Sequence, residues 1–163
     1  MTKIFYDYEQ NIVEKPQWEP VFWRPGAYGV LSNDLGQICL VLPKSKRFME
    51  LPGGGMEHDE TIAETLKREM FEETWFYVDI VTQNPLYVAE NFFFGNKSKM
   101  FFHAFYFVYG CEISKSDSEV QYQQNEWMAE IEKVIWVNID DIREDNTHPN
   151  SYRVLRDIFQ LPS

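Results

Sequence analysis

The sequence has few cysteines, few basic residues and no long apolar run. Its 163 residues include only two cysteines, Cys39 and Cys111, which both stand in apolar, strand-like stretches. We therefore expect buried free thiols rather than a disulfide. Lys and Arg total 15 against 26 Asp and Glu, which gives a net charge of −11. This balance argues against a nucleic-acid polymer as partner, because proteins that grip a phosphate backbone usually carry a basic face.

The N-terminus, MTKIFYDYEQNIVEK, lacks the apolar core of a signal peptide. No stretch approaches the roughly eighteen apolar residues of a membrane span. We expect a cytoplasmic protein with no membrane partner. The chain is 44% hydrophobic and 17% aromatic, which favours one domain over residues 1–163 with a substantial core.

What the chain does have is a glycine-rich segment followed by a dense set of carboxylates, LPGGGMEHDETIAETLKREMFEETWF, over residues 51–76. Three glycines after Pro52 predict a turn whose amides can approach a ligand. A helical pattern starts near Asp59 or Glu60, and Asp59 or Thr61 can cap it.

Three carboxylates of this helix share one edge. Glu69, Glu72 and Glu73 are spaced i, i+3 and i+4, so they fall within one arc of about 100°. An apolar stripe beside them would draw that edge toward the core; it consists of Ile62, Ala63, Leu66 and Met70. Like charges repel at this spacing, and a hard divalent cation such as Mg²⁺ would remove the conflict. The alternative interpretation is an ordinary solvated acidic helix.

This stretch resembles the signature of the Nudix hydrolases, also called MutT-like proteins. The matching positions are Gly54, Glu60, Arg68, Glu69, Met70, Glu72 and Glu73, while Trp75 stands where the family has a glycine. The resemblance covers about residues 27–160, with the family box at 54–76. It implies an α+β fold, an α/β/α sandwich with a mixed β-sheet between helices.

The resemblance also implies an activity, which is the metal-dependent hydrolysis of a nucleoside diphosphate linked to another moiety. The partner would be a small-molecule nucleotide or nucleotide conjugate, the cofactor Mg²⁺ or Mn²⁺, and a homodimer is possible. Its implied metal-binding residues are Gly54, Glu69, Glu72 and Glu73, with Arg68 as their orienter and Glu60 as a structural residue. The role of Glu57 stays open. A nucleotide-sensing module without catalysis is the alternative, but such modules usually lack some of these carboxylates.

Other candidate site residues lie outside the box. Family members often take a general base from the loop before the last strand, where Glu126, Glu130 and Glu132 stand, and we favour Glu130 or Glu132. Lys46 and Arg47 precede the glycine segment and could contact phosphate. Phe93 could stack on a base.

The remaining pattern predicts mainly strands. Residues 1–25 form an N-terminal extension of short extended segments, whose Trp18, Phe22 and Trp23 should pack in the core or a dimer, or else hold a base. Further strands are expected at 27–33, 37–43, 77–80, 85–94, 99–111 and 134–138, with a hairpin turn at 33–36, a loop at 116–125 and a helix at 151–160. His103 reads as a satisfied core residue.

Overall fold

The computed structural model describes residues 3–44, 46–115 and 131–161. Its main sheet has seven strands: six lie in the order β2-β1-β7-β8-β3-β5, and β6 also pairs with β8; a second sheet joins β4 to β9. The strands are β1 (Phe5–Tyr6), β2 (Ile12–Val13), β3 (Val21–Leu31), β4 (Ile38–Pro43), β5 (Gly53–Gly55), β6 (Val78–Ile80), β7 (Tyr87–Gly95), β8 (Met100–Ile113) and β9 (Ile131–Val137). The helices are α1 (Ile62–Thr74), the short 3-10 helix η3 (Ile139–Asp141) and α2 (Pro149–Phe159). None of the helices described is both long and apolar enough to cross a membrane.

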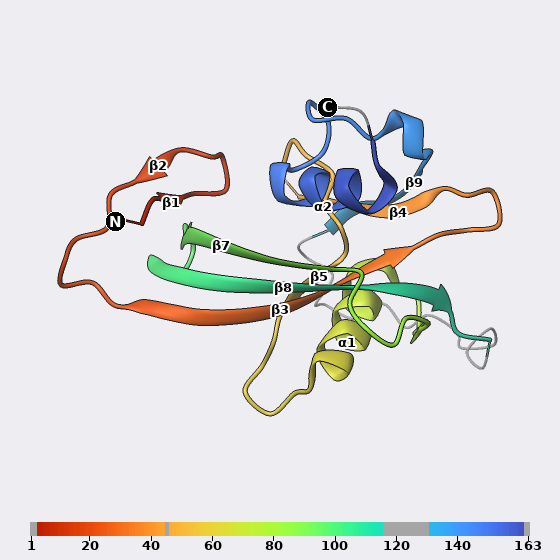
Figure 1. The fold of residues 1–163 in the computed structure, drawn as a ribbon, viewed down its shortest axis with the longest axis horizontal. Coiled ribbons are helices and arrows are strands. Elements are labelled where there is room, and N and C mark those ends of the chain that lie inside the picture. Colours follow the sequence, from red (N-terminus) through yellow and green to blue (C-terminus); the bar gives the residue numbers. More distant parts are fainter. Residues whose placement is uncertain (1–2, 45, 116–130, 162–163) are drawn as a thin grey trace.

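Two long parallel strands form the centre of the main sheet. β3 and β8 pair in one register from Val21↔Phe101 to Leu31↔Cys111. The predicted hairpin is present on the side of β8 away from β3, where β7 pairs antiparallel with β8. The sheet is therefore mixed, as expected, and α1 and α2 lie on its opposite faces (Figure 1).

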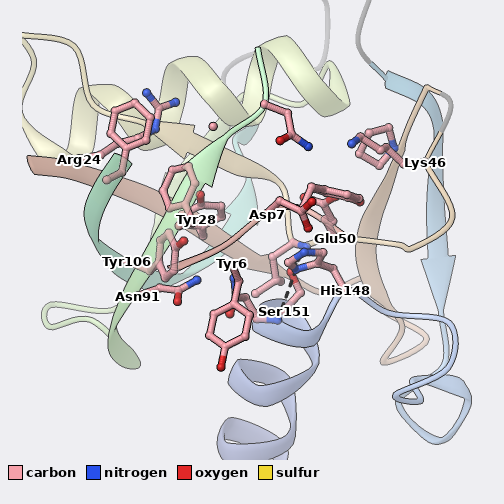
Figure 2. Close-up of a pocket in the computed structure, with 18 of the residues that line it drawn as sticks. Tyr6, Asp7, Arg24, Tyr28, Lys46, Glu50, Asn91, Tyr106, His148 and Ser151 are labelled. Atoms are coloured by element: carbon pink, nitrogen blue, oxygen red, sulfur yellow. Dashed lines mark hydrogen bonds between the residues drawn. The ribbon is translucent and has the colours of Figure 1, made fainter. Parts of the chain in front are cut away.

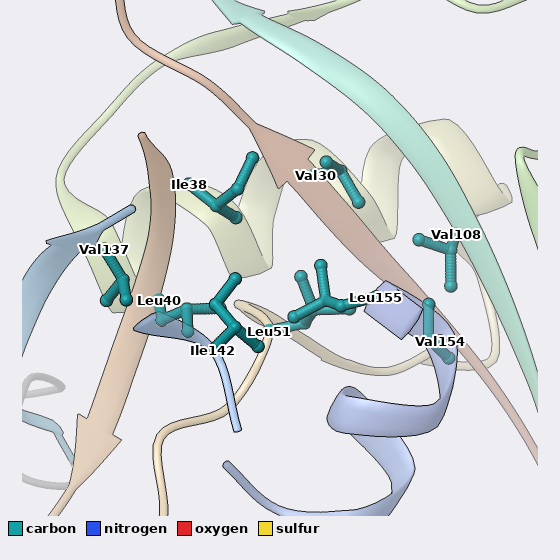
Figure 3. Close-up of a cluster of buried hydrophobic side chains, with 9 residues drawn as sticks. All are labelled: Val30, Ile38, Leu40, Leu51, Val108, Val137, Ile142, Val154 and Leu155. Atoms are coloured by element: carbon teal, nitrogen blue, oxygen red, sulfur yellow. The ribbon is translucent and has the colours of Figure 1, made fainter. Parts of the chain in front are cut away.

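Each face of the sheet has its own buried cluster. The cluster on the α2 side, drawn in Figure 3, is Val30, Ile38, Leu40, Leu51, Val108, Val137, Ile142, Val154 and Leu155. The cluster on the α1 side is Ala27, Leu31, Cys39, Leu66, Met70, Val78 and Cys111. Alternate residues of one strand point to opposite faces, so neighbours on β4 enter different clusters. Both cysteines are buried and free, as predicted.

The expected turn at residues 33–36 forms, but it does not join two paired strands. The Gly36 amide donates to the Asn33 carbonyl at 2.9 Å, and Gly36 has φ +74. Beyond a single bridge between Ser32 and Ile38, the two strands separate, and β4 pairs with β9 instead. The reason is that β3 already has β8 and β5 as its neighbours in the main sheet.

Helix α1 has a defined cap at each end. Thr61 is the N-cap, and Thr61 and Glu64 form a reciprocal capping box. The helix therefore begins two or three residues later than Asp59 or Glu60. It ends at Trp75, which takes up the left-handed conformation with φ 64, while its amide donates to the Phe71 carbonyl. Trp75 thus adopts the backbone geometry that usually selects glycine.

The N-terminal aromatic rings are not in the core, so that expectation was wrong. Trp18 is 79% exposed, Trp23 73% and Phe22 41%. Helix α1 covers the sheet only near the C-terminal end of β3, which leaves Trp23 stacked on Phe105 at the uncovered end. Packing of these rings against a second chain stays a prediction. His103 is stacked on Phe92, with ring centroids 4.2 Å apart, and it pairs with Glu90.

Candidate active site

The glycine segment is a short strand, not the turn we expected. β5 pairs antiparallel with β3 through Gly26↔Gly55, Ala27↔Gly54 and Tyr28↔Gly53. A Cβ at Gly54 would lie 2.5 Å from the Glu69 Oε1 atom, so any side chain there would displace this carboxylate. The strand therefore places its backbone directly against the carboxylate edge of α1.

Arg68, in the middle of α1, is the centre of a polar network between this helix and β5. Its Nε atom donates to Glu60 Oε1 at 2.5 Å, its Nη1 to Glu69 Oε1 at 2.9 Å and to Glu72 Oε2 at 3.2 Å. Its Nη2 atom also donates to the Gly55 carbonyl at 3.2 Å. The rigid guanidinium fork thus fixes three carboxylates and the end of β5 relative to one another.

The three predicted metal-binding carboxylates lie together along one edge of α1, next to β5. Glu69 is largely buried, with its side chain 15% exposed, whereas Glu72 is 43% exposed. Glu73 Oε2 accepts from the Gly53 amide at 2.8 Å, so it too faces β5. Burial raises the pKa of Glu69; Arg68 opposes this rise, and the neighbouring charge of Glu72 adds to it. A cation at this edge would relieve both the burial and the repulsion.

These residues fit a hard divalent ion. Over the described part of the chain, no three His, Cys, Asp or Glu side chains already converge in metal-ligand geometry. The donor set is nevertheless chemically suitable, since Mg²⁺ prefers carboxylate and carbonyl oxygens. The space above Gly54 that a Cβ would fill is occupied by the Glu69 carboxylate. The absence of a side chain at Gly54 therefore serves the carboxylate that would bind the ion.

A pocket of about 520 Å³ lies against the same edge, and Glu73 is one of its lining residues. Figure 2 shows Arg24 and Tyr28 on one side of it and Lys46, Glu50 and His148 on the other. Its walls are rich in aromatic rings: Tyr6, Tyr8, Tyr28, Phe93, Phe94, Phe102 and Tyr106. Such walls with a few polar groups are typical of small-molecule sites.

Some of the residues predicted to bind substrate or act as the base line the pocket, and others do not. Lys46 and Phe93 line the pocket, whereas Arg47 is exposed, is not among the lining residues and sits over the Phe48 ring. Glu132 is exposed within β9, at a register shift where Leu42 pairs with Lys133 and Pro43 with Ile131. Glu126 and Glu130 lie outside the described residues.

Sequence reasoning missed Arg24, which joins the pocket to the carboxylate edge. Its guanidinium packs on β5, because a Cβ at Gly55 would lie 2.7 Å from Arg24 Cζ. It also lies over the Phe102 ring, 5.5 Å from the centroid, and lines the pocket. Only the β3–β5 pairing reveals this position, so no local sequence pattern indicates it.

Sequence reasoning also missed a polar cluster on the far side of the pocket. The Tyr8 hydroxyl donates a short hydrogen bond to Glu50, and the Tyr8 ring lies against His148 with centroids 4.8 Å apart. Lys46 Nζ sits 3.4 Å from the centre of the Tyr8 ring. Side chains from three distant parts of the chain thus form one wall.

Comparison with known proteins adds a family and a fold. The NUDIX domain model matches residues 23–158. No curated protein sequence matches the chain. Similar solved structures include a UDP-X diphosphatase, with 23% identity and a TM-score of 0.59 over 90% of this chain and 67% of that one. A NUDIX hydrolase from Nitrosomonas europaea has 17% identity and a TM-score of 0.61, with 84% of this chain and 88% of that chain covered. The MutT protein from Methanosarcina mazei Go1 has 19% identity and a TM-score of 0.59, with 86% and 95% covered. At these identities the structural likeness shows the fold alone.

Proposed function

Because the chain belongs to the Nudix family, whose domain model spans residues 23–158, we propose that it is a metal-dependent hydrolase. Its substrate would be a nucleoside diphosphate linked to another moiety, and its cofactor Mg²⁺ or Mn²⁺. One observation carries this proposal: the Glu69 carboxylate and the Glu73 hydrogen bond both lie on β5, directly beside an aromatic pocket that Glu73 also lines.

The residues have distinct proposed roles. Glu69, Glu72 and Glu73, with the Gly54 backbone, would hold the ion, and Arg68 would orient Glu69 and Glu72 through the hydrogen bonds described above. When bound, such an ion neutralises a phosphoanhydride and lowers the pKa of a water molecule. Glu60 is structural in this scheme, since it accepts from Arg68, the Thr65 hydroxyl and the Glu57 amide.

Basic residues around the pocket would receive the anionic diphosphate. Arg24 is the best placed, because its guanidinium lies between the Gly55 backbone and the Phe102 ring and it lines the pocket. Lys46 lines the same pocket, and Arg47 remains a weaker proposal from the neighbouring loop. In a protein with a net charge of −11, such local cations are needed to offset repulsion of the substrate.

The general base stays a proposal among the acidic residues before and within β9. Glu132 is solvent-exposed, next to Ile131, which lines the pocket. Glu130 is the other candidate. Glu132→Gln and Glu130→Gln should be compared by their pH–rate profiles, because loss of a base removes the ascending limb governed by that group.

A substrate panel with product analysis tests the activity. The purified chain should release phosphate, nucleoside monophosphate or diphosphate from at least one nucleotide or conjugate with Mg²⁺ or Mn²⁺, and a chelator should abolish turnover. Glu72→Gln should lower kcat by several orders of magnitude with the fold intact by circular dichroism. Glu144→Gln is the matched control, since it removes the same charge from an exposed loop residue.

Near-normal turnover by Glu72→Gln would contradict the proposed metal-binding role. Tight nucleotide binding without any metal-stimulated product would instead favour the sensing alternative.

A further inference from the structure

In the wall that contains Tyr8, Glu50 and His148, the protein satisfies only part of the hydrogen-bonding capacity of the side chains. His148 is only 7% exposed. Its Nδ1 atom accepts from the Asn150 amide at 3.4 Å, so the neutral ring carries its proton on Nε2. This buried Nε2 atom has no hydrogen-bond partner among the described residues. A buried donor without a partner is destabilising, and a ligand that accepts from it would recover this cost.

His148 is a neutral hydrogen-bond donor at neutral pH and not a cation. Burial is the main reason that the pKa of its imidazole falls to about 4, and the charge of Lys46 contributes to this fall. The Tyr8 backbone acts in the other direction, although it makes no hydrogen bond of normal geometry to Nε2. At neutral pH the ring is therefore uncharged, with its one N–H on the buried Nε2 atom in the pocket wall.

Glu50 provides an acceptor in the same wall. The Tyr8 hydroxyl donates to its Oε1 atom, while no described residue donates to Oε2. The main chain of Glu50 is fixed as well, because its amide and carbonyl bond reciprocally to Val41, at 2.8 and 2.9 Å. The Glu50 carboxylate is an acceptor and the His148 imidazole is a donor. The edge of a nucleobase carries both donors and acceptors, so such a pair can bind it.

Tyr8 connects the two groups and comes from a segment that precedes the family match. It lies in the turn between β1 and β2, whereas the NUDIX domain model begins at residue 23. Its hydroxyl donates to the Glu50 carboxylate and so orients it. Its ring covers the His148 ring at an interplanar angle of 36°. The N-terminal segment therefore completes the wall.

We infer that Glu50 and His148 recognise the hydrogen-bonding edge of the base in a nucleotide, with Tyr8 as the residue that positions both. Glu50 accepts an N–H of the base, and His148 Nε2 donates to an adjacent oxygen or nitrogen. The aromatic walls, including Phe93, would contact the faces of the ring. This inference rests on the proposed function for the identity of the ligand, but it assigns discrimination between nucleotides to residues outside the metal-binding edge.

Binding without a divalent ion tests this inference apart from catalysis. Isothermal titration calorimetry should compare the four common nucleoside 5′-monophosphates with ribose 5-phosphate, which lacks a base. At least one nucleotide should bind about tenfold or more tightly than ribose 5-phosphate, since satisfying buried polar groups can supply more than 1.4 kcal/mol. Glu50→Gln and Tyr8→Phe should each reduce this preference at least about threefold and leave ribose 5-phosphate affinity unchanged.

Two features keep this result interpretable. Tyr8→Phe keeps the ring on His148 and Glu50→Gln is isosteric, so both should fold; Glu9→Gln, an exposed change in the same segment, is the charge-matched control. In turnover, Tyr8→Phe should raise KM far more than it changes kcat. Equal affinity for nucleotides and ribose 5-phosphate, or an unchanged preference in both variants, would overturn the inference. Loss of hydrolysis in the wild type with a retained base preference would instead count against the proposed function alone.

Discussion

Glu60 shows how one residue can matter to this site without being one of the proposed ion-binding residues. Its carboxylate receives both Arg68 Nε and Nη2, at 2.5 and 2.9 Å. The Arg68 hydrogen bond is the main reason that the pKa of Glu60 falls from an ordinary 4.5 to about 2. A carboxylate that binds its proton so weakly in the folded state links stability to pH.

The sign of that link gives a testable prediction. The unfolded chain binds a proton at Glu60 near pH 4.5, while the folded chain does so only near pH 2. The stabilisation from Glu60 is thus complete above about pH 5 and is lost as the pH falls toward 2. Urea unfolding at a series of pH values should show a steeper acid loss in the wild type than in Glu60→Gln. Glu144→Gln should follow the wild type, and identical slopes for Glu60→Gln and the wild type would contradict the assignment.

Residues differ in how well their roles could be read from the sequence. Glu69, Glu72 and Glu73 share a helix edge through local spacing alone, so their placement was predictable. Arg24 and His148 reach the pocket from β3 and from the start of α2. Their positions depend on strand pairing and helix docking between distant segments, which no local pattern contains.

At the level of elements, the C-terminus of α1 is unusual. The helix ends at Trp75 in the left-handed region, and the Trp75 ring packs edge-on against Phe71 at 5.5 Å. A side chain in this region costs about 1–2 kcal/mol, whereas glycine avoids that cost. Backbone strain and ring packing therefore act in opposite directions at one residue.

Two substitutions at Trp75 can separate these contributions. Trp75→Ala and Trp75→Gly both remove the ring, but only glycine relieves the left-handed strain. We expect the glycine variant to be more stable than the alanine variant by about 1 kcal/mol in chemical denaturation. Equal stabilities would mean that the helix ends in a different conformation.

The positions of the strands were easier to predict than the neighbours with which they pair. The apolar run at 37–43 is a strand as expected, yet it pairs with β9 rather than with the strand just before it. The glycines at 53–55 form β5 because β3 offers an open edge. Turn signals are local, but the choice of neighbour depends on the whole sheet.

At the scale of the whole molecule, one buried ring holds the N-terminal segment onto the sheet. Phe5 is 2% exposed and packs edge-on against Phe92 and Phe101, at 5.6 and 5.0 Å. Beside it, β1 joins β7 through a single pair, Tyr6↔Phe93. This ring therefore helps to hold in place the segment that carries Tyr8.

Phe5→Ala should release the segment. We expect a loss of about 3 kcal/mol, the lower end for a buried phenylalanine, because an edge segment can detach and relax. Hydrogen exchange should show lost protection across residues 5–13 and little change in α1. Ile4→Ala is the matched control, since Ile4 is 53% exposed and its truncation should cost within about 0.5 kcal/mol. Unchanged protection in Phe5→Ala would show that other contacts anchor the segment.

The position of Tyr8 ahead of residue 23 has a practical consequence for anyone who trims this protein to its recognisable domain. Such a shortened enzyme would retain every box carboxylate and could still turn over substrate. It would also bare Phe92 and Phe101 to water and lose the hydroxyl that steers Glu50. If Tyr8 has the proposed role, any tolerance of different nucleotides in the shortened chain would reflect the missing N-terminus and not the selectivity of the intact molecule.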